Sequence, residues 1–201
     1  MVRNFIKTAF RNLIKNKGFT AINILGLALG LATCLLIVFY VTDELSYDRF
    51  NKNFERIYRV DEDLKYNGDL YQDAVCPAPL AGTLTAQFPE IGNTVRFRQV
   101  GTFQVRKGTQ NIHEDYVTYC DNSIFKIFTL PIIDGNANSA LLAPNSVVIT
   151  ESIARKYFNR INVVGETLVF NDDKPFKVTG VIKDIPKQSH FRFHFLFRCQ
   201  H

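Results

Sequence analysis

The amino-terminal part of the chain passes from alternating apolar and basic positions into an uninterrupted apolar run. Between Lys17 and Asp43 the sequence carries no charge, and Thr20–Val41 is a run of 22 residues dominated by Leu, Ile, Ala and Val. A helix of this length spans about 33 Å, enough to cross a hydrocarbon core of about 30 Å. The pattern predicts one membrane-spanning helix, placed with its flanks at residues 19–43.

A cleaved signal peptide is the competing interpretation, because it also follows a basic start. Its apolar region is only about 7–15 residues long and ends at a small-residue cleavage site. Here the run is longer and leads into YVTDELSYD, which contains no such site. LATC at Leu31–Cys34 loosely resembles a lipoprotein cleavage box, but further apolar residues follow Cys34. The sequence therefore favours a retained membrane helix.

The segment before this helix has a four-residue rhythm of positive charge, at Arg3, Lys7, Arg11 and Lys15, followed by Lys17. Apolar residues occupy the positions between them at helical spacing: Phe5, Ile6, Ala9, Phe10, Leu13 and Ile14. Residues 1–18 are predicted to form an amphipathic helix on the cytoplasmic membrane surface, with its basic face toward anionic lipid headgroups. The alternative is a frayed terminus whose charges only orient the membrane helix.

Charge along the chain favours one orientation of the helix and argues against nucleic acid as a partner. The sequence has 24 Lys and Arg against 19 Asp and Glu, and the excess of five lies in the first 18 residues. Such a short basic segment is not the basic face of a nucleic-acid-binding domain. Basic residues are denser just before the apolar run than just after it, which favours a cytoplasmic amino terminus. Lys52, Arg56 and Arg59 weaken that contrast over a wider flank.

Two glycines in the apolar run form a GxxxG motif, Gly26 and Gly30. Small residues one helical turn apart let a second helix approach closely in a membrane. Glycine is common in membrane helices, so the motif alone predicts only a possible packing face.

Residues 44–201 alternate segments of strand and helix character, which predicts a mixed α+β extracytoplasmic domain. Asn67-Gly68 predicts a tight hairpin turn, and prolines at Pro77, Pro79 and Pro89 frame a short helix. Further strands are expected before and after Gly101 and Gly108, in SVVIT, GETLVF and PFKVTGVIKDI, and around a turn at Asp172-Asp173. The fold class is therefore α+β, with one amino-terminal transmembrane helix followed by this domain.

Motifs that carry chemistry are missing from the sequence. It contains no GxxxxGK[ST], GxSxG or HExxH, so no catalytic, cofactor-binding or metal-binding residue is assigned. His190 and His194 alternate in a predicted strand, which would separate their rings by about 13 Å, too far to share a metal ion. A Cys76–Cys120 disulfide stays open, because spacing alone does not fix the distance.

Several stretches, in this order, closely resemble MacB/FtsX-like ABC transporter permeases. They are AFRNLIKNKGFTAINILGLALGLA, DELSYDRFNKNFERIYRV, PAPLAGTLTAQFPEI, DNSIFKIFTLPIIDGN, PNSVVITESIARKYF and FKVTGVIKDIPKQSHFRF. The resemblance implies that residues 44–201 are a MacB-like periplasmic core domain, incomplete relative to the family. It covers nearly all of residues 1–195.

The resemblance also implies partners and a location. Two permeases pair, each contacts a cytoplasmic ABC ATPase, and nucleotide-driven movement reaches the periplasmic domains, where periplasmic or outer-membrane partners can bind. The expected location is the bacterial inner membrane, and the implied role is export or extraction of a substrate. Because Met1 directly precedes the amphipathic helix, the ATPase is expected on a separate chain.

Two further expectations concern the end of the chain and the function. The segment HFRFHFLF is expected to be an uncovered edge strand, and a chain with one membrane helix is expected to be unable to transport alone. The alternative function is a single-pass, membrane-anchored periplasmic binding or sensor module that does not transport. An anchored enzyme is the third possibility.

Overall fold

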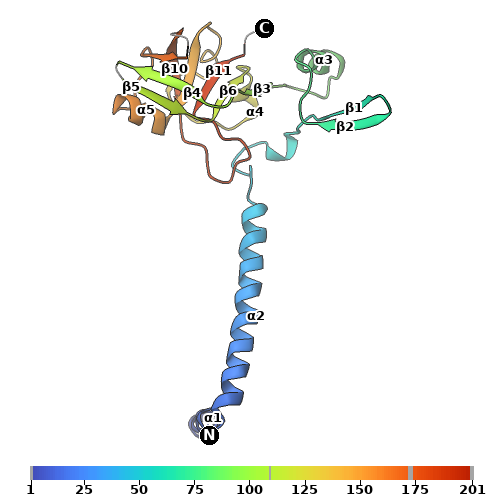
Figure 1. Ribbon diagram of the computed structural model, residues 1–201, viewed down its shortest axis with the longest axis vertical. Coiled ribbons are helices and arrows are strands. Elements are labelled where there is room, and N and C mark those ends of the chain that lie inside the picture. The colour runs from blue at the N-terminus through green and yellow to red at the C-terminus, as the bar shows by residue number, and fades with distance from the viewer. Residues whose placement is uncertain (1, 109, 172–173, 200–201) are drawn as a thin grey trace. The chain divides into compact units, whose positions relative to one another are not determined.

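The computed structural model describes residues 2–108, 110–171 and 174–199. The chain divides into two compact units, residues 1–47 and 48–201. The first unit is entirely helical, and the second is a mixed α+β domain (Figure 1). The predicted α+β fold class is confirmed.

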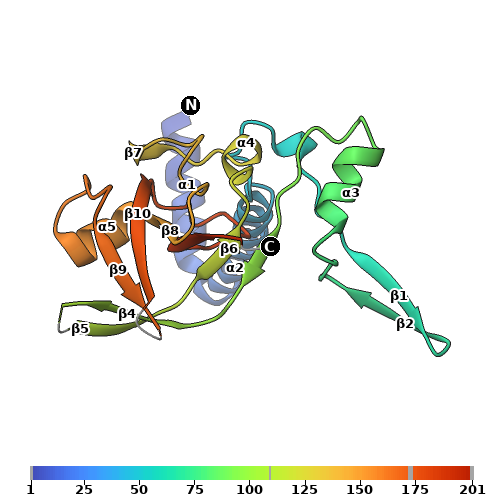
Figure 2. The same ribbon diagram turned by 90° about the horizontal axis from the view of Figure 1, so that it is seen from above.

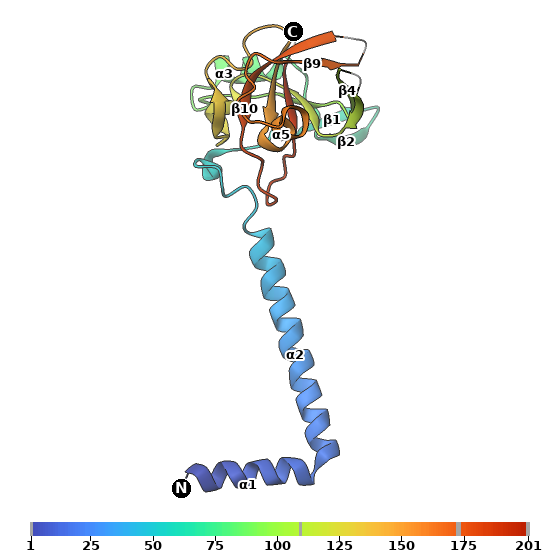
Figure 3. The same cartoon turned by 90° about the vertical axis from the view of Figure 1, so that its left-hand side faces the viewer.

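The first unit consists of helices α1 (Val2–Lys15) and α2 (Lys17–Glu44). Helix α2 contains the predicted span and buries none of its residues. Among the described residues, α2 is the one helix that is long and apolar enough to cross a membrane. The two helices meet at Asn16, whose backbone leaves the helical region (φ −108°, ψ 56°), and Figure 3 shows α1 turning away from the axis of α2. The hydroxyl of Thr20 donates a hydrogen bond to the carbonyl of Leu13 across this break (3.0 Å).

The second unit begins with a short 3₁₀ helix, Phe54–Arg56, and a separate hairpin. Strands β1 (Glu62–Tyr66) and β2 (Asp69–Asp73) pair across Asn67 and Gly68, both with positive φ (54° and 95°), which confirms the predicted turn. Helix α3 (Leu80–Gln87) follows where the prolines predicted it.

The remaining strands form one sheet. They are β3 (Phe97–Gln99), β4 (Phe103–Lys107), β5 (Gln110–Glu114), β6 (Val117–Cys120), β7 (Ile132–Gly135), β8 (Ser146–Thr150), β9 (Thr167–Phe170), β10 (Lys174–Ile182) and β11 (Phe195–Arg198). Two helices accompany them, α4 (Ile124–Ile127) and α5 (Glu151–Phe158). The strand order in the described residues is β3-β6-β11-β8-β10-β9-β4-β5, and β7 pairs with β10. The predicted turn at Asp172-Asp173 lies outside the described residues.

The segment from β3 to β4 closes the sheet on itself. Strand β3 pairs with β6, whereas β4 pairs with β9 at the other end of the central strands. The two strands are separated only by residues 100–102, where Gly101 takes a positive φ of 71°. One bent segment therefore joins both ends of the run β6-β11-β8-β10-β9, and the sheet is rolled around its own core.

Two apolar cores lie on the two faces of this sheet. The first is enclosed by the rolled sheet and α5 and contains Val105, Phe170, Phe195 and Phe197 among its members. The second lies against the other face, where Ile124 of α4 packs with residues such as Leu141, Val148 and Leu196. Burial of both faces explains why the central strands are apolar in nearly every position.

Strand β11 corrects the expectation of an uncovered edge at the end of the chain. It pairs with β6 on one side and β8 on the other, so it is a central strand. Phe195, Leu196 and Phe197 are at most 1% exposed. The strand also starts only at Phe195, so the strand predicted across His190 and His194 was too long, and His190 lies in the preceding loop.

A buried carboxylate attaches the edge strand β5 to α5. Glu114 is 5% exposed and accepts hydrogen bonds from the ammonium of Lys156 (2.6 Å) and the hydroxyl of Tyr157 (2.7 Å). Burial, and then the hydrogen bond to Glu114, raise the pKa of Tyr157 above its ordinary value. The pairing satisfies a charge that would otherwise be costly to bury.

The cysteines in the described part of the chain are free thiols. Cys76 donates to the carbonyl of Val60 (3.2 Å), whereas Cys120 is fully buried in the second core, and burial raises the pKa of its thiol. The Cys76–Cys120 bridge that the sequence left open is not formed in this structure.

Candidate functional site

A cluster of loop hydrogen bonds in the domain lies directly after helix α2 in the sequence. Helix α2 ends at Glu44, and Asp48 already belongs to the second unit. Asp48 adopts a left-handed backbone conformation, φ 56°, which Asp tolerates better than most residues. Its N–H donates to the carbonyl of Gln188 (2.9 Å). This turn aims the Asp48 side chain at the loop between β10 and β11.

The carboxylate of Asp48 binds two consecutive residues of that loop. Its Oδ1 accepts hydrogen bonds from the hydroxyl of Ser189 (2.9 Å) and from the backbone N–H of His190 (3.3 Å). Its Oδ2 lies 2.7 Å from Nδ1 of His190. Ser189 is only 4% exposed, so one of these bonds is shielded from water. Hydrogen bonds to an ionised group contribute about 1.5–3 kcal/mol, roughly twice a neutral pair.

Asn51 makes the second attachment, to the segment after α4. It is 2% exposed, and its amide donates to the carbonyl of Asp48 (3.1 Å) while its Oδ1 accepts from the N–H of Thr129 (2.9 Å). The hydroxyl of Thr129 in turn accepts from the N–H of Lys52 (2.9 Å). Residues 48–52 are therefore bound to two places that lie far away in the sequence. We call Asp48, Asn51, Thr129, Ser189 and His190 the joint.

The joint is a mechanical rather than a chemical arrangement. Its carboxylate and amide are engaged by backbone, hydroxyl and imidazole groups, and the Ser189 hydroxyl donates to Asp48 rather than to a histidine nitrogen, so these bonds do not form the nucleophile–base pair of a catalytic triad. What the arrangement does is fix residues 48–52 to the rest of their own domain. Loops with few buried contacts open easily. The joint gives this loop buried contacts through Asn51 and Ser189.

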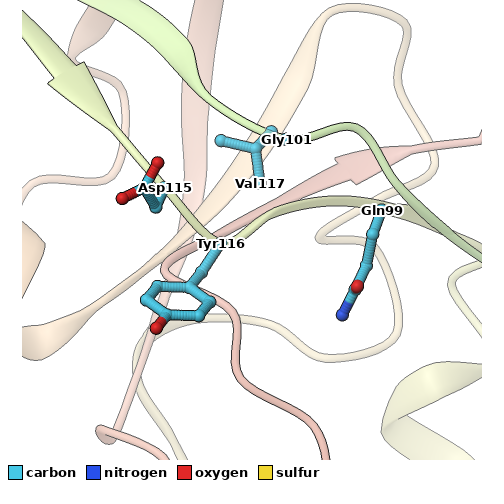
Figure 4. Close-up of a pocket in the computed structure, with 5 residues that line it drawn as sticks. All are labelled: Gln99, Gly101, Asp115, Tyr116 and Val117. Carbon is cyan, nitrogen blue, oxygen red and sulfur yellow. The ribbon is translucent and has the colours of Figure 1, made fainter.

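Two open hollows occur among the described residues of the domain. One, of about 260 Å³, is lined by Gln99, Gly101, Asp115, Tyr116 and Val117. Figure 4 shows the ring of Tyr116 and the amide of Gln99 extending to the same side. Asp115 accepts a hydrogen bond from Thr102 (2.6 Å), so its carboxylate is already used within the fold. No group of three metal-ligating side chains occurs among the residues described.

The residues singled out from the sequence lie in the first unit. Arg3, Lys7, Arg11 and Lys15 are exposed on α1, and Lys17 begins α2. Gly26 and Gly30 lie within α2, and a Cβ at either would meet nothing within 4 Å. Their predicted roles in lipid contact and helix packing stay predictions.

Sequence reasoning missed the joint. Asp48 and Ser189 are 141 residues apart, and no local pattern connects residues at that distance. Asn51 is buried within a polar stretch, and the burial of a single polar residue leaves no periodic signal in the sequence.

Comparison with known families places the chain. A profile of the MacB-like periplasmic core domain matches residues 20–197. The chain therefore belongs to this family, whose relatives are permeases of ABC transporters, and the resemblance seen in the sequence is confirmed. A comparison with curated proteins gives no match.

Three solved structures align with part of this chain. A domain of a permease protein from Porphyromonas gingivalis aligns with a TM-score of 0.58 at 20% identity, over 65% of this chain and 55% of that one. The periplasmic region of MacB from Actinobacillus actinomycetemcomitans aligns at 0.44 and 20% identity, over 59% and 52%. The extracellular domain of the noncanonic ABC-type transporter YknZ from Gram-positive bacteria aligns at 0.38 and 19% identity, over 45% and 49%. The chain spans about half the length of these structures.

Replacing Asn51 with Ala tests the joint directly. The substitution leaves the part-buried N–H of Thr129 without its acceptor, and we expect a loss of about 1–3 kcal/mol in the free energy of unfolding. Asn53→Ala is the matched control, because Asn53 is exposed and its side chain makes no cap hydrogen bond. Denaturant unfolding of the full chain in detergent measures both. Equal losses for the two variants would contradict the assignment.

Proposed function

We propose that this chain acts as a permease component of a MacB/FtsX-like ABC transporter. In this proposal a separate cytoplasmic ATPase drives α2, and α2 moves the extracytoplasmic domain during export or extraction of a substrate. Two copies pair in the membrane, and Gly26 and Gly30 offer a close-packing face on α2. Family membership supports the transporter context. The division into residues 1–18, 19–43 and 44–201, with the last on the periplasmic side of the inner membrane, is part of the proposal.

The joint is the observation that carries this proposal. A domain tethered by a loose linker does not follow the helix that anchors it, because a flexible chain transmits little displacement. Here only Leu45–Tyr47 separate α2 from Asp48, and Asp48 is bound to the loop between β10 and β11. That loop connects two central strands of the sheet. A displacement of the segment after the helix therefore has a short route to the core.

Helix α1 fits a role at the cytoplasmic membrane surface. At about 100° per residue, its basic residues and Asn4, Thr8 and Asn12 occupy one half of the helix, and the apolar residues other than Ile14 occupy the other half. Phe5 and Phe10 are 82% and 66% exposed within their unit, so the apolar half has no protein cover there. Lipid acyl chains would cover this half, while anionic headgroups and the ATPase lie on the side of the basic half.

Lengthening the link between helix and joint tests the proposed coupling. The full chain, reconstituted in nanodiscs with the ABC ATPase encoded nearest to its gene, should bind that ATPase. A non-hydrolysable ATP analogue should change deuterium uptake in residues 183–194, because the joint transmits movement to this loop. A flexible Gly-Ser insertion after Ser46 should abolish that change, whereas the same insertion between Asn67 and Gly68 should not. A nucleotide effect that survives insertion after Ser46, or no binding of the ATPase, would contradict the proposal.

Substitutions on the two halves of α1 test its placement. We expect Phe5→Ser, Phe10→Ser and Leu13→Ser together to raise deuterium uptake of residues 2–15 in nanodiscs that contain anionic lipid, since burial of the apolar half is lost. The matched control combines Asn4→Ser, Thr8→Ser and Asn12→Ser on the opposite half. If both triple variants exchange alike, α1 does not lie in the interface as proposed.

A further inference from the structure

Residues 57–93 form a part of the domain that stands apart from the rolled sheet. Figure 2 shows the β1–β2 hairpin and α3 projecting away from the other strands. Neither α3 nor the described part of the hairpin contains a buried residue. A two-stranded hairpin covered on neither face is marginally stable on its own. We call residues 57–93 the lobe.

Two short segments, the stems, connect the lobe to the rest of the domain, at residues 52–56 and 94–96. The first stem is held by the joint. The chain reaches the lobe from Asn51 and Lys52, and both bind Thr129, which lies just after α4. The 3₁₀ helix Phe54–Arg56 then leads into the lobe. The first stem is thus fixed to Thr129, just after the carboxyl end of α4.

The second stem is held by residues just before the amino end of α4. Arg96 makes a bidentate ion pair with Asp121, with its Nε 2.8 Å from Oδ2 and its Nη2 2.7 Å from Oδ1. The N–H of Arg96 also donates to Asp121 (3.1 Å), and the hydroxyl of Ser123 donates to the carbonyl of Thr94 (2.6 Å). The side-chain hydrogen bond to Asp121 raises the pKa of Arg96. Both stems therefore end on residues 121–129, which we call the seat.

Three aromatic rings connect the joint with the Arg96–Asp121 ion pair, and we call these two polar attachments the clamps. Phe128 precedes Thr129, Phe191 follows His190, and Phe97 follows Arg96. The rings of Phe97 and Phe191 stack at 5.1 Å, and Phe128 meets them edge-on at 5.6 and 5.3 Å. Such pairs contribute about 0.5–1.5 kcal/mol each beyond their buried area. The joint and the second stem thus share one packed support.

We infer that the lobe is a hinged body that swings about the seat, and that Asn51 and Arg96 are the positioning residues that set its resting orientation. Hinged bodies typically pivot on a few residues at the ends of elements while their interiors stay intact. The stems at residues 52–56 and 94–96 meet that description, because they are short and are fixed mainly by polar clamps, with Val95 of the second stem packed against the second core. That α2 drives the swing rests on the proposed function; the hinge itself does not.

Electron–electron distance measurements on the full chain in nanodiscs test the hinge. Spin labels carried by unnatural amino acids at Lys65 in the lobe and Lys177 in β10 report on the swing, and labels at Lys126 and Lys177 report on the body. We expect Asn51→Ala combined with Arg96→Ala to broaden the lobe-to-body distribution about twofold while the body distribution stays narrow. Arg96→Lys, which keeps the charge but loses the bidentate geometry, should give an intermediate width.

The control variant is Arg59→Ala, which removes an exposed ion pair with Asp61 inside the lobe (2.8 Å) and should leave both distributions unchanged. A lobe-to-body distribution that stays narrow in the double variant would overturn the hinge. Equal broadening of the body distribution would also overturn it, because the clamps would then hold the core. Added ATPase and ATP analogue should shift the wild-type lobe distance. If the double variant broadens the distribution but nucleotide shifts nothing, the hinge stands and the proposed drive by α2 fails.

Discussion

The arrangement of the domain depends on which groups form hydrogen bonds with the backbone and side chains of residues 48–52, which follow helix α2. Residues 48–52 cannot continue a helix, and Asn51 is buried, so their polar groups need partners within the domain. Asp48 finds them in Ser189 and His190, and Asn51 finds them in Thr129. Because those partners sit beside the second core, satisfying five residues also fixes where the chain meets the sheet.

The rolled sheet provides the rigid partner that this attachment needs. A bent segment joins its two ends, and its central strands are buried on both faces, so a displacement at the loop between β10 and β11 acts on a well-packed body. The lobe lacks such support and is held at its stems. Rigid sheet, polar joint and clamped lobe together are what the proposed movement of the domain in parts requires.

Much of the local structure could be predicted from the sequence, because period and turn chemistry are local. The uncharged run before Asp43, the Asn67-Gly68 turn and the strand at SVVIT each carry their own signal. The central position of β11 could not be predicted, because an apolar strand has the same sequence pattern at an edge and in the middle of a sheet. The joint and the seat were equally invisible, since Asp48 with Ser189 and Arg96 with Asp121 meet only after the chain has folded.

A double-mutant cycle on Asp48 and Ser189 measures the central claim most directly. Asp48→Ala, Ser189→Ala and the double variant are unfolded by denaturant as full chains in detergent, and the coupling energy is taken from the four free energies of unfolding. Contacting residues in one hydrogen-bonded network couple by about 0.5–3 kcal/mol, whereas independent sites add to within about 0.5 kcal/mol. The account predicts a favourable coupling in the upper part of that range, because the bond is charge-assisted and shielded. Additive losses would show that the residues following the membrane helix are not fastened to the domain through Asp48.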